Sequence, residues 1–395
     1  MLLTASLSFG QVNKDYQTSK DIQKLVDSET NPLKFNDHAL LFSKIGNYKA
    51  SLAVQNLYVE KNKAVRNSPE KSKSDIANFK RFKPKNALDI ISKTAEKYNI
   101  VITNEAHYQP QNRVFTSLLL AKLYKQGFRY FCVEDLRFND STENTELNKR
   151  KYPLKSSGYY IVEPQYGNLV REALNIGYKL VNYEHYPSGE IKDPQQQWQA
   201  RETGQAKNIG AILLKDPKAK IFVYCGYGHL NENPSGEGGF MGRMLKKNFN
   251  IDPLTIDQVN LLEEYNDTYY NLTDVKEPSV YLADNEFFNN PKVGTQTDMS
   301  VVFPKTKYIN GRPNWLVYDK NRKYYFPKLE NTKLVYPVMI FAYHKNEDIS
   351  ITVPADIIEI EKSDAKTALV LKKGQYTLQV KDATGNVIEQ NIEIK

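Results

Sequence analysis

The chain contains few of the residues that mark disulfide-rich, redox or membrane proteins. Its 395 residues include 2 cysteines and 2 tryptophans. Cys132 and Cys225 both fall inside apolar runs, so we expect free buried thiols and no disulfide. No apolar run approaches the roughly 18 residues that a membrane-spanning helix requires, which predicts that the chain has no transmembrane span.

Several short motifs of catalysis and binding are also missing. The sequence lacks a Walker phosphate loop, GxGxxG, HExxH, GxSxG and CxxC. Nucleotide-binding proteins, zinc proteases, serine hydrolases and thiol redox enzymes are therefore not indicated by their usual signatures.

Acidic residues are fewer than basic ones: the formal net charge is +8, and the basic residues are densest in Glu60–Lys85. No nucleic-acid fold motif and no basic repeat interleaved with aromatic residues accompanies them. We therefore expect a solvated basic face and no nucleic-acid partner, and weak attraction to anionic surfaces or substrates stays open.

The first residues are similar to the end of a signal peptide. Leu2–Gly10 is apolar and rich in small residues, and Gln11 begins a polar stretch. Ser8 and Gly10 stand where signal peptidase prefers small side chains, although the usual basic start is missing. We predict that residues 1–10 are a signal-peptide remnant and that the protein is secreted, periplasmic or at the cell surface. A frayed terminus is the alternative.

Hydrophobic periodicity divides the rest of the chain into three parts. Residues 11–86 predict a helical N-terminal segment, with helical spacing in Asp21–Val26 and Ala39–Leu57. Residues 87–275 alternate helices with strands, which predicts an α/β domain with a mostly parallel sheet and helices on both faces. Residues 276–395 predict a β-rich, sandwich-like C-terminal domain, which could associate with a cell surface.

Proline and glycine positions, together with hydrophobic periodicity, predict several individual helices and strands. Pro164 and Gly177 bracket a helix, whereas Asn139–Ser157 shows no clear element. In the C-terminal part we expect short strands that include Trp315–Tyr318 and Ile349–Val353, and a hairpin around the turn at residues 382–386. Whether residues 279–343 join the C-terminal domain or extend the main sheet stays open.

Four predicted strands end in ionisable residues. These clusters are Glu105 with His107, Glu134 with Asp135, Glu184 with His185, and His229 after Gly226-Tyr227-Gly228. Ligands of open α/β sheets bind outside the carboxyl ends of parallel strands. Each cluster alone fits a surface turn or a structural ion pair, but their recurrence predicts one polar site built from distant segments.

Two arginines lie near these clusters in sequence. Arg113 follows His107 in the first turn of a predicted helix, and Arg201 shares one helix face with Gln205 and Asn208. Either arginine could bind an anionic group or an oxyanion. The polar stripe of Arg201 could equally face solvent.

The residues that carry these clusters resemble a known superfamily. The stretches are IVITNEAHYQPQNRVFTSLLLAKLYKQGFRYFCVEDL and RETGQAKNIGAILLKDPKAKIFVYCGYGHL. They are similar to the motifs of the erythromycin esterase, ChaN-like and Tiki/TraB superfamily, over roughly residues 87–256. One departure is Asn104, which stands where the first motif usually has glycine; an asparagine can adopt the left-handed turn expected there.

The resemblance implies a site at the strand ends and several activities. Members hydrolyse a macrolactone with a histidine-activated water, bind haem, or act as metal-dependent proteases. By position, Glu105, His107, Glu134 and His229 match the functional residues, and Arg113, Arg201 and Glu202 match the supporting ones.

Our leading hypothesis is an exported hydrolase of an ester, lactone or amide, with a small-molecule, peptide or glycan substrate. His107 would activate water, oriented by Glu105; His229 and an arginine would stabilise the oxyanion, and Glu134 would orient or protonate. The residues expected to contact or position substrate are Arg113, Arg201, Glu184, His185 and Tyr227.

Cofactor use stays open. If a divalent metal takes part, its expected ligands are His107, His229, Glu105 and Glu134. The alternative function is haem or metal binding without turnover, with a histidine, Tyr108 or Tyr227 as axial ligand. A degenerate descendant used for surface interaction is the third possibility.

Overall fold

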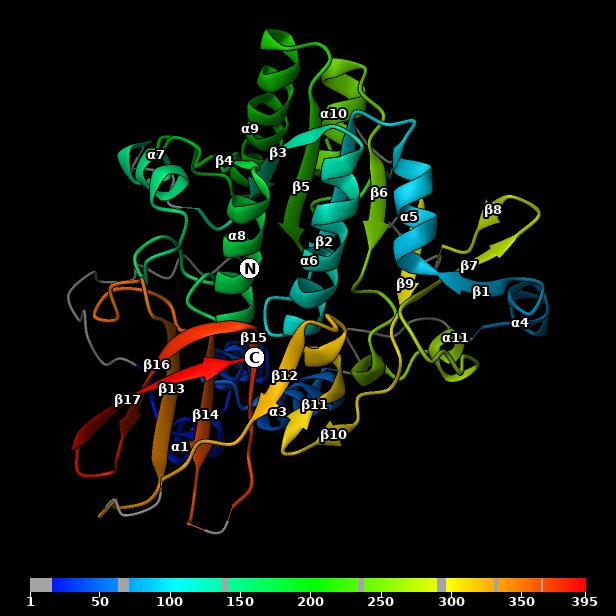
Figure 1. Ribbon diagram of the computed structural model, residues 1–395. Coiled ribbons are helices and arrows are strands. Elements are labelled where there is room, and N and C mark those ends of the chain that lie inside the picture. Colours follow the sequence, from blue (N-terminus) through cyan, green and yellow to red (C-terminus); the bar gives the residue numbers. More distant parts are fainter. Residues whose placement is uncertain are drawn as a thin grey trace.

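The computed structural model describes residues 16–62, 71–136, 141–233, 238–289, 296–329, 333–363 and 365–395 (Figure 1). The expected signal-peptide remnant at 1–10 and part of the basic stretch lie outside these ranges. None of the helices described in them is both long and apolar enough to cross a membrane.

The main sheet is mixed and mostly parallel, as the sequence predicted. Its order is β1-β7-β9-β6-β2-β5-β3-β4, and β8 pairs with β7. Strands from β9 to β4 in this order are parallel, whereas β1, β7 and β8 are antiparallel to their neighbours. The bounds are β1 (Lys83–Asn86), β2 (Ile100–Glu105), β3 (Phe128–Val133), β4 (Lys179–Asn182), β5 (Lys220–Gly226), β6 (Leu254–Asp257), β7 (Ser279–Ala283), β8 (Glu286–Phe287) and β9 (Met299–Val302).

Helices cover both faces of this sheet because alternate strand residues point to opposite sides. In β5, Phe222 and Tyr224 face one helical layer, whereas Ile221, Val223 and Cys225 face the other. The first layer contains α5 (Ala87–Ala95), α6 (Pro110–Lys125) and α8 (Pro164–Ile176), and the second contains α9 (Pro194–Lys215) and α10 (Met241–Phe249).

Both cysteines are free and buried in the second layer, as expected. The ends of α8 also agree with the sequence. Pro164 occupies its first turn, and Gly177 ends it with φ of 112°, a conformation that glycine adopts without steric cost.

The N-terminal segment forms short helices. They are α1 (Ser19–Ser28), η1 (Pro32–Lys34), α2 (Phe35–Lys44), α3 (Tyr48–Lys61) and α4 (Lys73–Phe79). The helical spacing over Ala39–Leu57 corresponds to two helices, α2 and α3, because the chain turns at Gly46, where φ is 72°. A Cβ at Gly46 would stand 2.1 Å from the Ile357 carbonyl oxygen, so a strand far along the chain packs into this turn.

The C-terminal part is antiparallel. A sheet of order β14-β13-β16-β17 is accompanied by the pairs β12–β15 and β10–β11. The elements are β10 (Tyr308–Ile309), β11 (Arg312–Pro313), η3 (Asn314–Val317), β12 (Arg322–Tyr325), β13 (Val338–His344), β14 (Asp356–Ile360), β15 (Leu369–Lys372), β16 (Gly374–Lys381) and β17 (Val387–Ile394). One face of the four-stranded sheet packs on β15, and the other packs on the N-terminal helices.

Several local expectations for this region need correction. The expected hairpin is β16–β17, but Trp315–Tyr318 contributes to the 3₁₀ helix η3, and Ile349–Val353 makes only an isolated bridge at Thr352. Strands β7 and β9 pair with the main sheet, so that sheet continues past residue 275. Residues 263–265 and 268–271 form η2 (Glu263–Tyr265) and α11 (Thr268–Asn271).

The segment Asn139–Ser157, expected to lack structure, contains α7 (Ser141–Arg150). Its buried apolar residue Leu147 joins the main core. The next residue, Asn148, accepts from the Leu180 N–H at 2.9 Å and donates to the Leu180 carbonyl at 3.0 Å. Helix α7 therefore lies against β4, the last strand of the sheet.

Candidate functional site

Glu105, the last residue of β2, is buried at the carboxyl end of the sheet. Arg113 binds both of its oxygens, through Nε to Oε2 at 2.6 Å and Nη2 to Oε1 at 2.8 Å. The Tyr224 hydroxyl donates to Oε2 at 2.7 Å. Burial alone would raise the pKa of Glu105, but the Arg113 guanidinium overcomes it and lowers that pKa to about 2. Glu105 is therefore ionised at neutral pH, and its hydrogen bonds hold it in one position.

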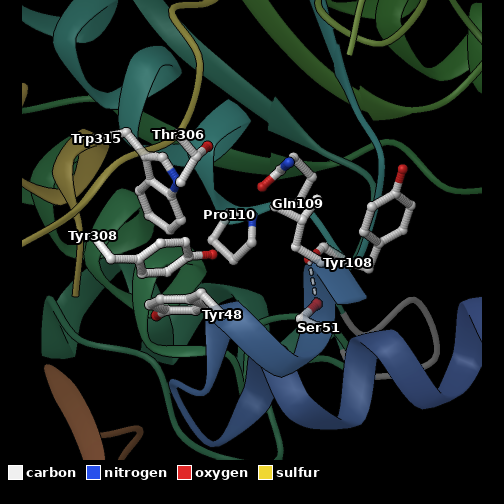
Figure 2. Close-up of a pocket in the computed structure, with 9 residues that line it drawn as sticks. Tyr48, Ser51, Tyr108, Gln109, Pro110, Thr306, Tyr308 and Trp315 are labelled. Atoms are coloured by element: carbon white, nitrogen blue, oxygen red, sulfur yellow. Dashed lines mark hydrogen bonds between the residues drawn. The ribbon is translucent and has the colours of Figure 1, made fainter. Parts of the chain in front are cut away.

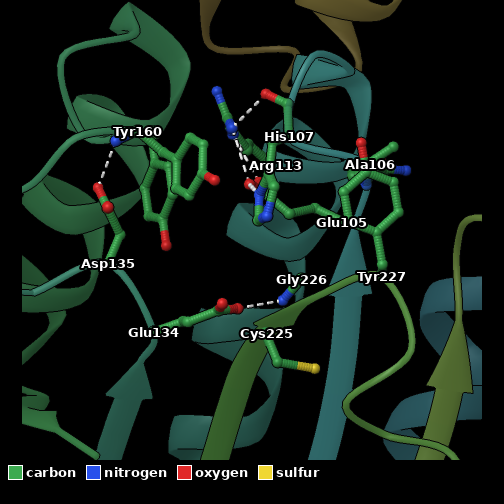
Figure 3. Close-up of polar contacts among 12 residues, drawn as sticks. Glu105, Ala106, His107, Arg113, Glu134, Asp135, Tyr160, Cys225, Gly226 and Tyr227 are labelled. Carbon is green, nitrogen blue, oxygen red and sulfur yellow. Dashed lines mark hydrogen bonds and ion pairs between the residues drawn. The ribbon is translucent and has the colours of Figure 1, made fainter. Parts of the chain in front are cut away.

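This carboxylate orients the first histidine. Glu105 Oε1 lies 2.8 Å from His107 Nδ1, which in the neutral ring carries the proton and leaves Nε2 as an acceptor (Figure 3). The His107 ring stacks on Tyr160, with centroids 3.8 Å apart and planes 11° apart, and meets Tyr227 edge-on at 5.0 Å. Arg113 Nη2 also donates to the His107 carbonyl at 2.7 Å. The ring is thus fixed on several sides.

Asp135 holds the tyrosine of this stack in place. Its carboxylate accepts the backbone N–H groups of Tyr159, Tyr160 and Ile161 at 3.0, 2.6 and 2.7 Å. Burial raises the pKa of Asp135 to about 7 against the lowering effect of these donors. The residue caps the turn at 159–161 and so positions Tyr160.

Aromatic packing supports the turn that follows His107. Pro110, at the start of α6, lies among Tyr48, Tyr308 and Trp315 (Figure 2). The cavity between them has a volume of about 10 Å³, room for a single water molecule at most. This region is therefore a packed support for the site.

His107 and Glu134 meet at Gly226, where β5 ends. A Cβ placed on Gly226 would stand 2.4 Å from His107 Cε1, 2.7 Å from His107 Nε2 and 3.1 Å from Glu134 Oε2. The Gly226 N–H donates to Glu134 Oε2. The absence of a side chain here lets the imidazole approach the backbone and the second carboxylate (Figure 3).

Glu134 belongs to a second polar cluster. Arg201 Nη2 lies 3.0 Å from Glu134 Oε1 and also binds Glu184, to which Arg201 Nε donates at 3.0 Å. His229 Nδ1 lies 2.8 Å from Glu202 Oε1, and its Nε2 lies 3.5 Å from Glu134 Oε1. Arg201, with 30% of its side chain exposed, is the most accessible member.

The charges of this cluster fix its protonation. Burial alone would lower the pKa of His229, but Glu134 and Glu202 on its two sides raise that pKa to about 10. His229 and Arg201 together keep the pKa of Glu134 well below its ordinary value. At neutral pH the cluster therefore contains an imidazolium and an ionised Glu134, so Glu134 can orient a group but has no proton to give.

The structure brings together most of the residues expected from the sequence. Contacts link Glu105, His107 and Arg113, and another set links Glu134, Glu184, Arg201 and His229; the two sets adjoin at Gly226. The polar stripe of α9 faces this cluster, since Gln205 donates to Glu184 at 2.9 Å.

Two expected residues differ from the rest. The His185 ring packs on Gly204 and, with residues of α9, lines a separate groove of about 670 Å³. Tyr227 touches His107 with its ring edge, while its hydroxyl donates to Asn36 at 3.1 Å.

Sequence reasoning missed three contributors to the site. Tyr160 stacks on His107, Tyr224 binds Glu105, and Glu163 accepts from Arg113 Nη1 at 2.8 Å. Only Glu163 carried a signal, because it precedes Pro164 at a helix start and caps α8. The explanation offered for Asn104 is also wrong: it lies within β2, and its amide donates to Asp257 at 2.9 Å and to the Tyr227 carbonyl at 2.7 Å.

The residues expected to hold a metal do not fit one in this arrangement. Both oxygens of Glu105 are bound by Arg113, and Arg201 Nη1 lies 3.2 Å from His229 Nε2, where its positive charge opposes a bound cation. Within the described ranges, no three or more His, Cys, Asp or Glu side chains are grouped to hold a metal ion.

The tyrosines considered for haem do not fit that role either. The buried Tyr108 hydroxyl donates to Glu264 at 2.6 Å, and the Tyr227 hydroxyl donates to Asn36. Neither oxygen is free to ligate iron.

Comparison with known proteins gives distant likenesses in structure only. No family model matches the chain, and neither does any curated protein. The structure of the type III effector HopBA1 aligns at 14% identity and a TM-score of 0.37, over 56% of this chain and 96% of that one.

Two toxin structures align over about half of their own length. One is RRSP, a MARTX toxin effector domain from Vibrio vulnificus, at 14% identity and a TM-score of 0.31, over 63% of this chain and 52% of that one. The other is the C-terminal region of Pasteurella multocida toxin, described as having a thiol-protease-like catalytic triad, at 10% identity and a TM-score of 0.31, over 84% and 52%.

Proposed function

We propose that the protein is a hydrolase of an ester, lactone or amide bond, with His107 as the base that activates water. The observation that carries the proposal is the Glu105–His107 pair, whose 2.8 Å contact at Nδ1 leaves Nε2 beside Gly226 and Glu134. A carboxylate that fixes the tautomer of an imidazole is the arrangement used in histidine-based acyl transfer. Arg113 keeps that carboxylate ionised.

The reaction follows from the positions of these groups. Water gives a proton to His107 Nε2 while its oxygen bonds to the substrate carbonyl carbon. The carbonyl oxygen becomes an oxyanion, and Arg201, the most accessible cation of the second cluster, stabilises it. When the intermediate collapses, the bond to the leaving oxygen or nitrogen breaks, and that atom takes the proton from Nε2.

His229 supports this step through its contact with Arg201. Its Nε2 lies 3.2 Å from Arg201 Nη1, and Glu202 holds its Nδ1. The imidazolium adds positive charge, and Glu134 keeps both cations in place. We assign His229 and Glu134 positioning roles.

The resemblance to the erythromycin esterase, ChaN-like and Tiki/TraB superfamily supports the same reaction class. Export of the protein is also part of the proposal and rests on residues 1–10. The substrate class we propose is a small molecule, peptide or glycan derivative with an activated carbonyl.

The test is hydrolysis of a panel of p-nitrophenyl esters, lactones and anilides by wild-type protein and His107→Gln. We expect the variant to lose about 10²–10⁴-fold in kcat/KM, the usual contribution of a general base. The matched control is His38→Gln, because His38 forms a similar pair with Glu29 at 3.0 Å in the N-terminal helices.

Wild-type protein that hydrolyses no member of the panel would refute the proposal. Equal rates for folded His107→Gln and wild type would refute it as well.

A further inference from the structure

A second cavity lies away from the site, between α8 and the C-terminal strands. Its volume is about 70 Å³, several times the space that one water molecule needs. The polar side chains that line it are Asn168, Arg171, Glu172, Asn175, Arg322, His344, Lys372 and Tyr376. The one carboxylate among them, Glu172, is paired with Lys372. These side chains come from α8 and from β12, β13, β15 and β16, so the cavity lies where the two parts of the chain meet.

Arg322 is the most unusual residue of this cavity. It is 6% exposed, and among the described residues no carboxylate lies within 4.0 Å of its guanidinium. Its Nη1 donates to Gln165, and its Nε and Nη2 have no acceptor in the same ranges. Asp319 and Asp356 interact with this guanidinium electrostatically from beyond ion-pair distance. Burial of a cation that is compensated only at a distance is costly, so this position favours an anion.

The neighbouring cations are already paired. Arg171 binds Glu347 through two hydrogen bonds of 2.7 and 2.6 Å, and Lys372 lies 2.7 Å from Glu172 and 2.9 Å from Asp319. These ion pairs engage Glu347, Glu172 and Asp319, so none of these three carboxylates forms an ion pair with Arg322.

His344 is a neutral imidazole in this cavity. Burial, together with Arg171 and Lys372, lowers the pKa of His344 to about 4. Its ring packs on Tyr376, with centroids 4.7 Å apart, and its nitrogens have no hydrogen-bond partner in the described part of the chain. A neutral imidazole can donate one N–H to a ligand oxygen.

We propose that this cavity binds a small tetrahedral oxyanion, a phosphate or sulfate group, with Arg322 as its main partner. A guanidinium offers paired N–H donors that match two oxygens of such a group. The Asn168 side-chain amide donates one proton to the Ala355 carbonyl at 2.7 Å, and its second proton and the ring of His344 supply further donors around the anion. Bound there, the anion joins α8 to the C-terminal sheets; the N-cap residue of α8 is Glu163, which binds Arg113 of the site.

Thermal unfolding tests the proposal with inorganic phosphate as the probe. Phosphate, sulfate and chloride are compared at equal ionic strength. We expect phosphate or sulfate, and not chloride, to raise Tm saturably by roughly 3–6 °C. A parallel arm with glycerol 2-phosphate distinguishes a free ion from the phosphate group of a larger ligand, since either result supports the oxyanion site.

Arg322→Gln is expected to abolish the phosphate-dependent shift. Lys323→Gln is the matched control, because it removes the same charge from the next residue, which is exposed. His344→Phe, expected to weaken the shift, serves if Arg322→Gln does not fold. A shift that is equal in chloride, or that survives in both cavity variants, would overturn the proposal.

Discussion

A methyl group at Gly226 is expected to lower the activity strongly while leaving the protein folded. In Gly226→Ala the new Cβ would stand 2.4 Å from His107 Cε1 and 2.7 Å from Nε2. Ordinary contact begins near 3.4 Å. The imidazole would therefore have to retreat by several tenths of an ångström to about 1 Å. Glu105 and Tyr160 hold the ring on other sides, so this movement breaks the geometry at Nε2.

The size of the effect follows from this displacement. A shift of about 1 Å in a catalytic group costs about 100-fold in rate. Overpacking costs about 1–3 kcal/mol of stability, partly offset by the roughly 0.4–1 kcal/mol that alanine contributes by restricting the unfolded chain. We expect kcat/KM to fall about 100-fold and the free energy of unfolding to fall by no more than about 2–3 kcal/mol.

The assay is hydrolysis of the ester that wild-type protein turns over fastest, with urea unfolding and the NMR signal of the His107 ring measured alongside. Gly228→Ala is the control, because its Cβ would meet only the Phe240 ring edge, at 3.2 Å. Full activity of Gly226→Ala together with an unshifted His107 signal would refute the reasoning.

Three further outcomes follow from the same contacts. Tyr160→Ala is expected to lower kcat/KM about 10-fold, because ring stacking contributes roughly 0.5–1.5 kcal/mol, and Tyr160→Phe should restore most of it in the same ester assay. Since the pKa of His229 is raised from 6.5 to about 10, its contribution to stability is complete below pH 6.5 and lost as pH rises toward 10; urea unfolding across that range should show a steeper decline for wild type than for His229→Gln. Since the pKa of Glu105 is lowered from 4.5 to about 2, its contribution, on the order of 3 kcal/mol, is present above pH 4.5 and lost as pH falls toward 2. Glu105→Gln should therefore lose that stability at neutral pH and flatten the acid side of the unfolding curve, and an unchanged acid side would contradict this.

The parts of the fold that the sequence predicts well are governed by local signals. Helix α8 begins at Pro164 and ends before Gly177, as predicted, because both residues restrict the backbone directly. The strand-end clusters were found for a related reason: parallel strands end at one edge, so residues distant in sequence converge there.

The failures share a dependence on distant partners. The turn at Gly46, which helical spacing does not indicate, packs against Ile357. Strand β14 pairs with β13, and β15 pairs with β12, so both strands depend on partners elsewhere in the chain. Helix α7 has little apolar periodicity and depends on Leu147 and on the contact of Asn148 with Leu180. Tyr160 was missed because its partner, His107, is on another element and no spacing connects the two.

The contact between Asn148 and Leu180 has a consequence for self-association. A terminal strand normally presents unpaired backbone groups that can recruit a strand from another molecule. The Asn148 amide satisfies one N–H and one C=O of β4, in the way a neighbouring peptide group would. Helix α7 thus covers this edge of the sheet, and Asn148→Ala is expected to expose it to aggregation through strand addition.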